Sequence, residues 1–519
     1  MRHRLRTRHR LITIAILIVA IATPLMAQNG AHQPNASQRS YQQARRVLDD
    51  AIEAHGGLEA MRAIKDFTLK EKSKIYARFQ SPSAEPPFAG GTSEETLIVD
   101  TERGLVYDDL KTANAGFNNW VRTVIKGNEG HAYDMWSRTV TPVANPSVNN
   151  FRGQMRRIPP FVLLEALDRA ATLRWLGEDE IGGRKQKVIT VIRPDNQQLS
   201  LSFDAQTNLL TRYGYLYADP VTGDSEIAQT YAGYRTIGKL KLPSSRALYN
   251  SGGVIQEAEY TDLQINTKPA ESVFVGPDNF EKLAAAPATP PPPAVSKVAE
   301  DVYLLQGLAG GTHNVLFVAF NDHILVLEAP EQILYGSNSV QALTKIKETV
   351  PGKPIKYLVL THHHSDHAGG FREYVAEGAT IVTTANTKTF LEKAVKESSL
   401  LPKLQGRQNK LTIETIENKK RIFQDDKHVV EIYDVGPNPH ANEILVAYLP
   451  KEKILFQADL LNPAANGTIP IAQDSTISFS ERLQQLGLQV EKIYGVHGRV
   501  ATPEELRTSI EKRRASDLK

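Results

Sequence analysis

The stretch LVLTHHHSDHAGG, residues 358–370, places four histidines and one aspartate within six positions, directly after an apolar run. Imidazole rings are costly to crowd, because protonated rings repel one another and neutral rings still need hydrogen-bond partners. Side chains alternate along an extended chain, so His362 and His364 point the same way and can converge on one ion. Asp366 and His367 follow as the chain turns. The spacing therefore predicts donors for two neighbouring metal ions.

Three further donors each lie just past an apolar run that predicts a strand. His440 follows VVEIYDV across GPNP, Asp459 ends KILFQAD, and His497 ends EKIYGV. Strand ends of one sheet meet at a common edge, where these side chains can join the histidine cluster. The chain has no cysteine, so any metal must be held by histidine and carboxylate, and disulfides and cysteine nucleophiles are excluded.

Less specific interpretations of the same residues exist. A histidine run alone can be a solvated segment, the loops around His440 and His497 can be ordinary loops, and Asp459 can be a turn residue. Metal ligation is favoured because the donors occur together with Gly369 and Gly370, which allow a close approach of the backbone as a helix begins. His363 is expected to face away from the ions.

The elements that must position these donors lie in the second part of the chain, residues 298–519. Strand patterns alternate there with helical ones, which predicts two sheets flanked by helices, an αββα sandwich. The last helix is expected to begin with Thr502 as N-cap, Pro503 at the first helical position and Glu505 closing a capping box.

This second part resembles the metallo-β-lactamase superfamily, because THHHSDHAGG fits its hallmark, with closing glycines shared by glyoxalase II enzymes and lactonases. The resemblance implies two zinc ions per chain, with the ligands His362, His364 and His440 on the first, Asp366, His367 and His497 on the second, and Asp459 bridging them. The chain departs from the family pattern in having Pro-His-Ala around His440 and Ala458 before Asp459. These departures leave the ligands intact and concern only the substrate subclass.

The resemblance also implies a reaction. Iron oxidases on this fold have glutamate in place of the middle histidine, and this chain keeps His364, so zinc is favoured over iron. Metal coordination lowers the pKa of water from 15.7 to near 7 and so supplies a nucleophilic hydroxide, which Asp366 is expected to orient while relaying its proton. Glu328 is predicted to hold the ring of a ligand histidine, with a surface position as the alternative. His313 and Asn314 either line the cleft or form a turn.

The first part, residues 40–280, has an opening helical pattern and then runs with period two, which predicts a mainly antiparallel β domain. AHGGLEAMRAI and the later meander resemble the bacterial lipoprotein-carrier fold, a half-open barrel around a helical lid that holds acyl chains. Alternatively, this domain only shapes the cleft or mediates dimerisation. A proline-rich linker is expected at 281–297, because four consecutive prolines fit neither a helix nor a central strand.

Residues 1–27 combine five arginines with the apolar run LITIAILIVAIA, which predicts a secretory signal peptide cleaved after Ala27 and a periplasmic location. The alternative is an uncleaved membrane anchor. Without this segment the formal charge falls from +3 to about −2, so no basic surface for nucleic acid is expected. No stable membrane span is expected in the mature chain.

Two functions remain open at this point. The first is a zinc-dependent hydrolase that acts on an ester, thioester, lactone or β-lactam, with a small molecule as substrate. The second is a periplasmic lipid- or ligand-binding carrier protein with a vestigial metal domain. A vestigial site should have lost ligands, and all seven expected donors are present, so the hydrolase is favoured.

Overall fold

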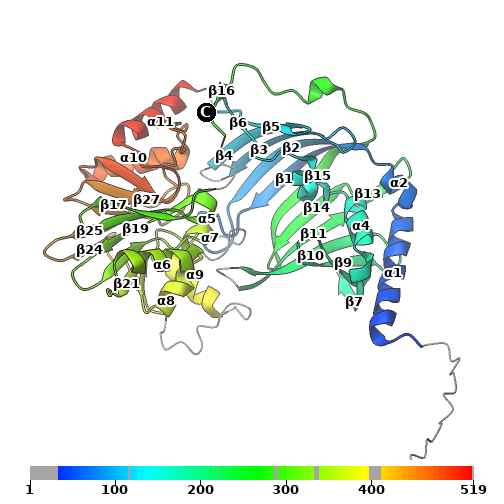
Figure 1. The fold of residues 1–519 in the computed structure, drawn as a ribbon, viewed down its shortest axis with the longest axis horizontal. Coiled ribbons are helices and arrows are strands. Elements are labelled where there is room, and N and C mark those ends of the chain that lie inside the picture. The colour runs from blue at the N-terminus through cyan, green and yellow to red at the C-terminus, as the bar shows by residue number, and fades with distance from the viewer. Residues whose placement is uncertain are drawn as a thin grey trace, which may run out of the picture.

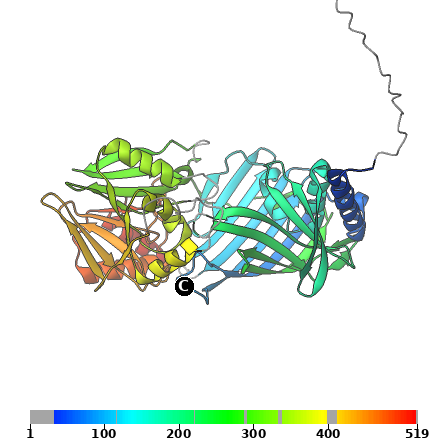
Figure 2. The ribbon, with the colours of Figure 1, turned by 90° about the horizontal axis from the view of Figure 1, so that it is seen from below.

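The computed structural model describes residues 33–114, 117–219, 221, 223–285, 290–331, 338–396 and 411–516. The chain forms a β-rich N-terminal domain and a layered α/β C-terminal domain, which lie side by side in two perpendicular views (Figures 1 and 2). The predicted signal peptide lies outside the described residues. Within the described part, no helix has the length and apolar character needed to cross a membrane.

The N-terminal domain is built on one strongly curved sheet of fourteen strands (Figures 1 and 2). Neighbouring strands are antiparallel except for the pair β16–β6. In spatial order the strands are β16 (Glu281–Lys282), β6 (Thr139–Pro142), β5 (Glu129–Asp134), β4 (Phe117–Lys126), β3 (Leu105–Asn114), β2 (Gly90–Asp100), β1 (Asp66–Tyr76), β15 (Gly253–Ile265), β14 (Ser245–Asn250), β11 (Gly223–Ala232), β10 (Leu210–Asp219), β9 (Gln198–Asp204), β8 (Arg184–Ile192) and β7 (Arg174–Ile181). A separate ribbon pairs β12 (Arg235–Ile237) with β13 (Leu240–Leu242).

Helices cover one face of this sheet. They are α1 (Ala36–Ala54), α2 (Leu58–Arg62), α3 (Arg152–Met155) and α4 (Pro159–Asp168), with 3-10 turns η1 (Val148–Phe151) and η2 (Ala170–Thr172). A third 3-10 turn, η3 (Glu271–Val273), packs near Ile98 on the other face. Leu48 of α1 and Leu163 of α4 are fully buried against Phe67 of β1. The domain begins earlier than residue 40, because Asn35 and Gln38 form a capping box that starts α1 at Ala36. The predicted antiparallel β domain is thus present.

The C-terminal domain contains two sheets. The first has seven strands in the order β17 (Ala294–Ala299), β18 (Val302–Gly307), β19 (His313–Ala319), β20 (Ile324–Leu327), β21 (Ile355–Val359), β22 (Thr380–Thr383) and β23 (Ile413–Thr415). The second has five in the order β24 (Lys420–Gln424), β25 (Val429–Asp434), β26 (Leu445–Leu449), β27 (Ile454–Gln457) and β28 (Lys492–Gly495). Leu325 and Phe456 are among the residues that pack between the two sheets.

Helices cover the outer faces of both sheets. They are α5 (Leu308–Gly311), α6 (Asn338–Thr349), α7 (Ser365–Ala368), α8 (Phe371–Ala376), α9 (Ala385–Lys396), α10 (Asp474–Leu486) and α11 (Pro503–Ala515). Phe371 of α8 packs on the first sheet and Phe479 of α10 on the second. The αββα arrangement is therefore confirmed. The capping box of the last helix is also confirmed, with Thr502 accepting from the backbone of Glu505.

Strands of both domains extend into the predicted linker 281–297. Its first two residues form β16, which pairs with β6 of the N-terminal sheet. At its other end β17 already begins at Ala294 and pairs with β18 of the C-terminal sheet. Between these strands, the described residues 283–285 and 290–293 form no strand, and the rest of the predicted linker lies outside the described residues.

Two hairpin connections of the N-terminal sheet dock on the C-terminal domain. The β1–β2 loop, residues 77–89, buries Ala84, and the β10–β11 turn buries Val221, both in the apolar cluster that contains Phe371. Arg372 donates to the carbonyl of Val221 at 3.1 Å. These contacts fix the orientation of the β1–β2 loop relative to the histidine-rich stretch, residues 358–370.

His55, at the end of α1, provides a test of the N-terminal core. Its Nδ1 donates to the carbonyl of Ala51 at 2.8 Å, and its Nε2 accepts from the backbone of Leu210 at 3.4 Å, so the buried ring is neutral. Burial lowers the pKa of His55 to about 4. Because the unfolded ring takes up a proton near pH 6.5, the free energy of unfolding falls as pH drops from 6.5 towards 4, by about 3 kcal/mol over the full range.

The stability advantage of the wild-type chain over His55→Gln should therefore shrink between pH 7.5 and pH 5, because glutamine does not titrate. Thermal unfolding of both proteins at the two pH values measures this difference. An advantage that stays constant or grows as pH falls would contradict the assignment of a neutral, buried His55.

Candidate metal centre

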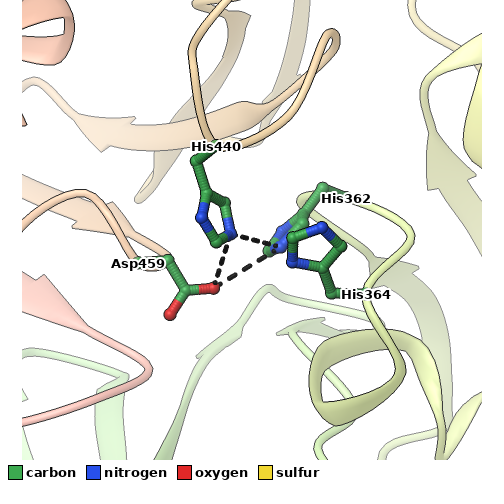
Figure 3. Close-up of side chains that lie close together, drawn as sticks. All are labelled: His362, His364, His440 and Asp459. Carbon is green, nitrogen blue, oxygen red and sulfur yellow. Dashed lines mark hydrogen bonds and ion pairs between the residues drawn. The ribbon is translucent and has the colours of Figure 1, made fainter. Parts of the chain in front are cut away.

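The donors meet at one edge of the two sheets. His362 and His364 follow β21, His440 lies in the loop after β25, Asp459 follows β27 and His497 follows β28. Figure 3 shows side chains from three of these loops turned towards a common point. The structure brings these residues together at neighbouring strand ends, as the sequence predicted.

The first cluster comprises His362, His364, His440 and Asp459, whose ligand atoms all lie within 4.8 Å of one another. The Nε2 atoms of His362 and His440 are 3.1 Å apart. Asp459 Oδ2 is 3.4 Å from Nε2 of His362 and 3.1 Å from that of His440 (Figure 3). These are the three predicted ligands of the first ion together with the predicted bridging carboxylate.

The second cluster comprises Asp366, His367 and His497. Asp366 Oδ2 lies 3.6 Å from Nε2 of each histidine, and the two Nε2 atoms are 3.4 Å apart. His313, at the start of β19, adds a fourth imidazole, with Nε2 3.8 Å from Asp366 Oδ2. The ligand atoms of His313, Asp366 and His497 lie within 4.8 Å of one another, as do those of His367, Asp459 and His497.

Asp459 lies between the two clusters. Its Oδ2 is 2.6 Å from His367 Nε2, and its Oδ1 is 3.2 Å from His497 Nε2. The same carboxylate thus contacts histidines of both sets, as a bridging ligand must. Its backbone has a φ of 59°, a left-handed conformation that is uncommon outside glycine and is found at functional sites.

The ring nitrogens that face away from the centre have outer partners. His367 Nδ1 is 3.0 Å from Glu328 Oε2, and His497 Nδ1 is 3.1 Å from the carbonyl oxygen of Thr312. The other oxygen of Glu328 accepts from the backbone of Thr361 at 2.7 Å. Glu328 is fully buried and has a φ of 80°. It therefore holds the ring of His367, which is the place that sequence reasoning assigned to it, and it is not a surface residue.

Gly370 illustrates the close packing behind the centre. A Cβ atom there would lie 1.6 Å from Ser339 Oγ and 2.9 Å from the carbonyl oxygen of Ala329. The predicted close approach of the backbone at this glycine is thus confirmed.

The carboxylates of Asp366 and Asp459 favour positive charge on the groups around them. Burial lowers the pKa of His362 and His364 well below the usual value, so these rings are neutral, the form in which imidazole binds metals. Burial also opposes the charged form of His367, but the carboxylates of Asp459 and Asp366 outweigh it and raise the pKa well above its usual value. The pKa of His497 rises to about 9 because its bonds to the same two carboxylates outweigh burial.

These features fit divalent metal ions. His364 Nδ1 is buried without a hydrogen-bond partner among the described residues, although its ring lies in the first cluster. Imidazole nitrogens that face one another at 3.1 and 3.4 Å need a shared proton or a cation between them. Five imidazoles and two carboxylates are the nitrogen and oxygen donors that zinc binds in proteins.

A cleft of about 590 Å³ opens above the centre. Both domains line it: Asn118 of β4 and Trp136 of the β5–β6 turn come from the N-terminal domain, and His440 and Asp459 from the C-terminal domain. At its wall, Gln473 bonds to the backbone of Asn118 in both directions, at 3.2 and 3.4 Å. A small molecule can therefore reach the ligand side chains from the interdomain space.

Sequence reasoning left the roles of His313 and Asn314 open and did not identify Gln80. Asn314 does not line the cleft; its amide donates to the carbonyl oxygens of Gly495 and Gly498 and so fixes the loop of His497. His313 lies at the second cluster. Gln80, in the β1–β2 loop, donates to Asp366 Oδ1 at 2.7 Å, a contact across 286 positions that no local pattern could have revealed.

Comparison with known proteins agrees with the C-terminal resemblance. Residues 336–497 match the sequence model of the metallo-beta-lactamase superfamily, a range that contains all seven predicted ligands. The resemblance inferred from THHHSDHAGG is thereby confirmed for this part of the chain.

Solved structures similar to part of this chain include the DIM-1 metallo-beta-lactamase, with 17% identity, 44% of this chain and 98% of that chain covered, and a TM-score of 0.34. A metallo-beta-lactamase from Pontibacter korlensis has 21% identity, with 43% and 99% covered and a TM-score of 0.34. FIM-1 from Pseudomonas aeruginosa, in a mono-zinc form, has 17% identity, with 44% and 97% covered and a TM-score of 0.33.

Replacing Glu328 by Gln should weaken metal binding at the His367 cluster by about 10- to 100-fold, because an amide has one acceptor for two donors. Competition with a chromophoric zinc chelator measures this affinity. The same substitution at exposed Glu348, which pairs with Lys345, is the matched control and should leave the affinity unchanged. Wild-type affinity in Glu328→Gln would show that Glu328 does not position a ligand.

Proposed function

We propose that this protein is a metal-dependent hydrolase whose centre holds two zinc ions per chain. The observation that carries the proposal is the convergence of all seven predicted donors, in two clusters that share Asp459, at the base of an accessible cleft. Structural zinc sites fill all four positions with protein donors and are closed, whereas a catalytic site needs an open position. The match of residues 336–497 to the metallo-beta-lactamase superfamily supports the same class of reaction.

The predicted ligands form two sets, one for each ion. His362, His364 and His440 would hold one ion, and Asp366, His367 and His497 the other, with Asp459 between them. When bound, such ions polarise a substrate carbonyl and lower the pKa of coordinated water. The carboxylate of Asp366 faces the centre through Oδ2, while Gln80 holds Oδ1, so it is placed to accept a proton from an attacking water.

The lining of the cleft bears on the substrate. Amides and hydroxyls dominate it, including Asn118, Asn462 and Ser137, with Trp136 as an aromatic surface. Among the described lining residues there is no lysine or arginine. A substrate carboxylate would thus lack a cationic side chain in the cleft, which favours a neutral ester, lactone or thioester over a β-lactam.

The alternative of a carrier with a vestigial metal domain draws less support. On the face of the sheet that carries the hydrophobic core, Glu71 is buried and pairs with Arg157 at 3.4 Å and with Arg246 at 2.5 Å. Arg157 also pairs with Glu95 at 2.7 Å. A buried ion network on this face is an unfavourable surface for an acyl chain.

Purified protein supplemented with zinc should contain two zinc ions per chain by elemental analysis, and His364→Ala should lose turnover by on the order of 100-fold or more while remaining folded. Circular dichroism verifies the fold of the variant. Fewer than one metal per chain after supplementation would contradict the proposed centre.

A substrate panel tests the reaction: a neutral aryl ester, an acyl-lactone, a thioester and a chromogenic cephalosporin, each with and without chelator. We expect chelator-sensitive hydrolysis of at least one neutral acyl substrate, and slower turnover of the cephalosporin because its carboxylate has no cationic partner in the cleft. Silence on the whole panel with both zinc sites occupied would favour the carrier function instead.

A further inference from the structure

The N-terminal domain reaches the metal centre through the β1–β2 loop, residues 77–89. This loop leaves the N-terminal sheet at Tyr76, and Arg78 ties it to its own domain by donating to the carbonyl oxygen of Asn250 at 2.8 Å. It then runs alongside the stretch that carries the histidines, where the backbone of Ser365 donates to the carbonyl oxygen of Phe79 at 3.4 Å. The loop is thus held from both domains.

Ser81 supplies a hydrogen bond to a predicted zinc ligand. Its carbonyl oxygen lies 3.0 Å from His364 Nε2, and both residues are fully buried. A carbonyl oxygen can only accept, so His364 must carry its proton on Nε2 and leave the lone pair on Nδ1. Nδ1 is the buried nitrogen without a partner among the described residues. The contact therefore selects the tautomer that presents Nδ1 as a ligand.

Gln80, the preceding residue, contacts the other cluster. Its Nε2 donates to Asp366 Oδ1 at 2.7 Å, while Asp366 Oδ2 points at His367 and His497. The amide occupies one carboxylate oxygen and leaves the other for an ion, so it fixes which oxygen of Asp366 is the ligand and how the carboxylate is turned.

The β1–β2 loop is held in place around Gln80 and Ser81 by its own contacts. Ser81 Oγ accepts from the backbone of Ala89 at 2.9 Å, which closes the loop on itself. The carbonyl oxygen of Pro82 accepts from the backbone of Asn442, two residues beyond His440, at 2.8 Å. Phe79 packs edge-on against Phe390 of α9, with ring centroids 6.4 Å apart. The position of the β1–β2 loop is therefore set by backbone hydrogen bonds and by packing on both sides of the residues that contact the predicted ligands.

We infer that the metal centre is completed across the domain boundary: Gln80 and the carbonyl group of Ser81 are positioning groups for one ligand in each cluster, Asp366 and His364. In this account the N-terminal domain is required to form the centre with full metal affinity, which is a role beyond shaping the cleft. The inference rests on the proposed two-zinc centre and assigns two further groups to it.

Substitution of Gln80 tests the inference with a readout that is independent of turnover. Gln80→Ala and Gln80→Met, which removes the amide but keeps the length, should each weaken zinc binding at one of the two sites by about tenfold in competition with a chromophoric chelator. Gln80 is exposed, so folding should be unaffected, and thermal unfolding of the metal-free proteins verifies this. Lys393→Ala is the matched control, because it removes the ion pair with Glu85 of the same loop without touching a ligand, and its zinc affinity should equal that of the wild type.

A second measurement reports on Ser81. A long-range ¹H–¹⁵N spectrum of the zinc-loaded protein, assigned with His364→Ala, should show His364 protonated on Nε2 and coordinated through Nδ1. Wild-type affinity at both sites in both Gln80 variants would overturn the role of Gln80, and protonation on Nδ1 would overturn that of Ser81. If the wild-type chain itself binds no zinc, the proposed function fails instead, so the two failures are distinguishable.

Discussion

The partly buried carboxylates of Asp366 and Asp459 require a compensating positive charge, and the structure around the centre supplies it. Asp459 contacts histidines from both clusters, with its closest approach of 2.6 Å to His367. A carboxylate in such a place is costly unless cations or hydrogen-bond donors surround it. Although burial opposes it, these carboxylates raise the pKa of His367 and His497, which favours positively charged rings beside them. Divalent ions among the same donors would satisfy the same requirement.

The fold around the centre follows from this requirement. Strands such as β21 and β27 are mostly apolar, and the donors come only after the strands end. Behind the donors, Glu328 has a left-handed backbone conformation. Its buried carboxylate accepts one hydrogen bond with each oxygen, from the backbone of Thr361 and from the ring of His367, and so orients the chain after β21. Strain at Glu328 and Asp459 is sustained because the packed sandwich leaves these residues no alternative.

The convergence of the seven predicted donors could be predicted from sequence because their signal is local. His362 to His367 occupy one strand end, and the remaining donors lie just past apolar runs, His440 after the loop GPNP, so periodicity places them at one edge of the sheets. The αββα class followed from the same alternation. Glu328 was identifiable as an acid ending a buried strand, although sequence could not show which ring it holds.

What sequence could not supply depends on contacts between distant segments. Gln80 and Ser81 lie in a polar loop of another domain, nearly three hundred residues before the ligands, with no periodicity or motif to mark them. His313 precedes the motif by about fifty residues and reaches Asp366 only because β19 lies in the same sheet as β21. The start of α1 was missed because the capping box of Asn35 and Gln38 outweighs the polar composition of that segment.

The central claim is that two metal ions flank Asp459. Diffraction data collected at the zinc absorption edge from crystals of the zinc-loaded protein address it most directly. The account predicts two anomalous peaks about 3.5–4 Å apart, one among His362, His364 and His440 and the other among Asp366, His367 and His497. An anomalous map with no peak there, or with one peak at full zinc loading, would contradict it.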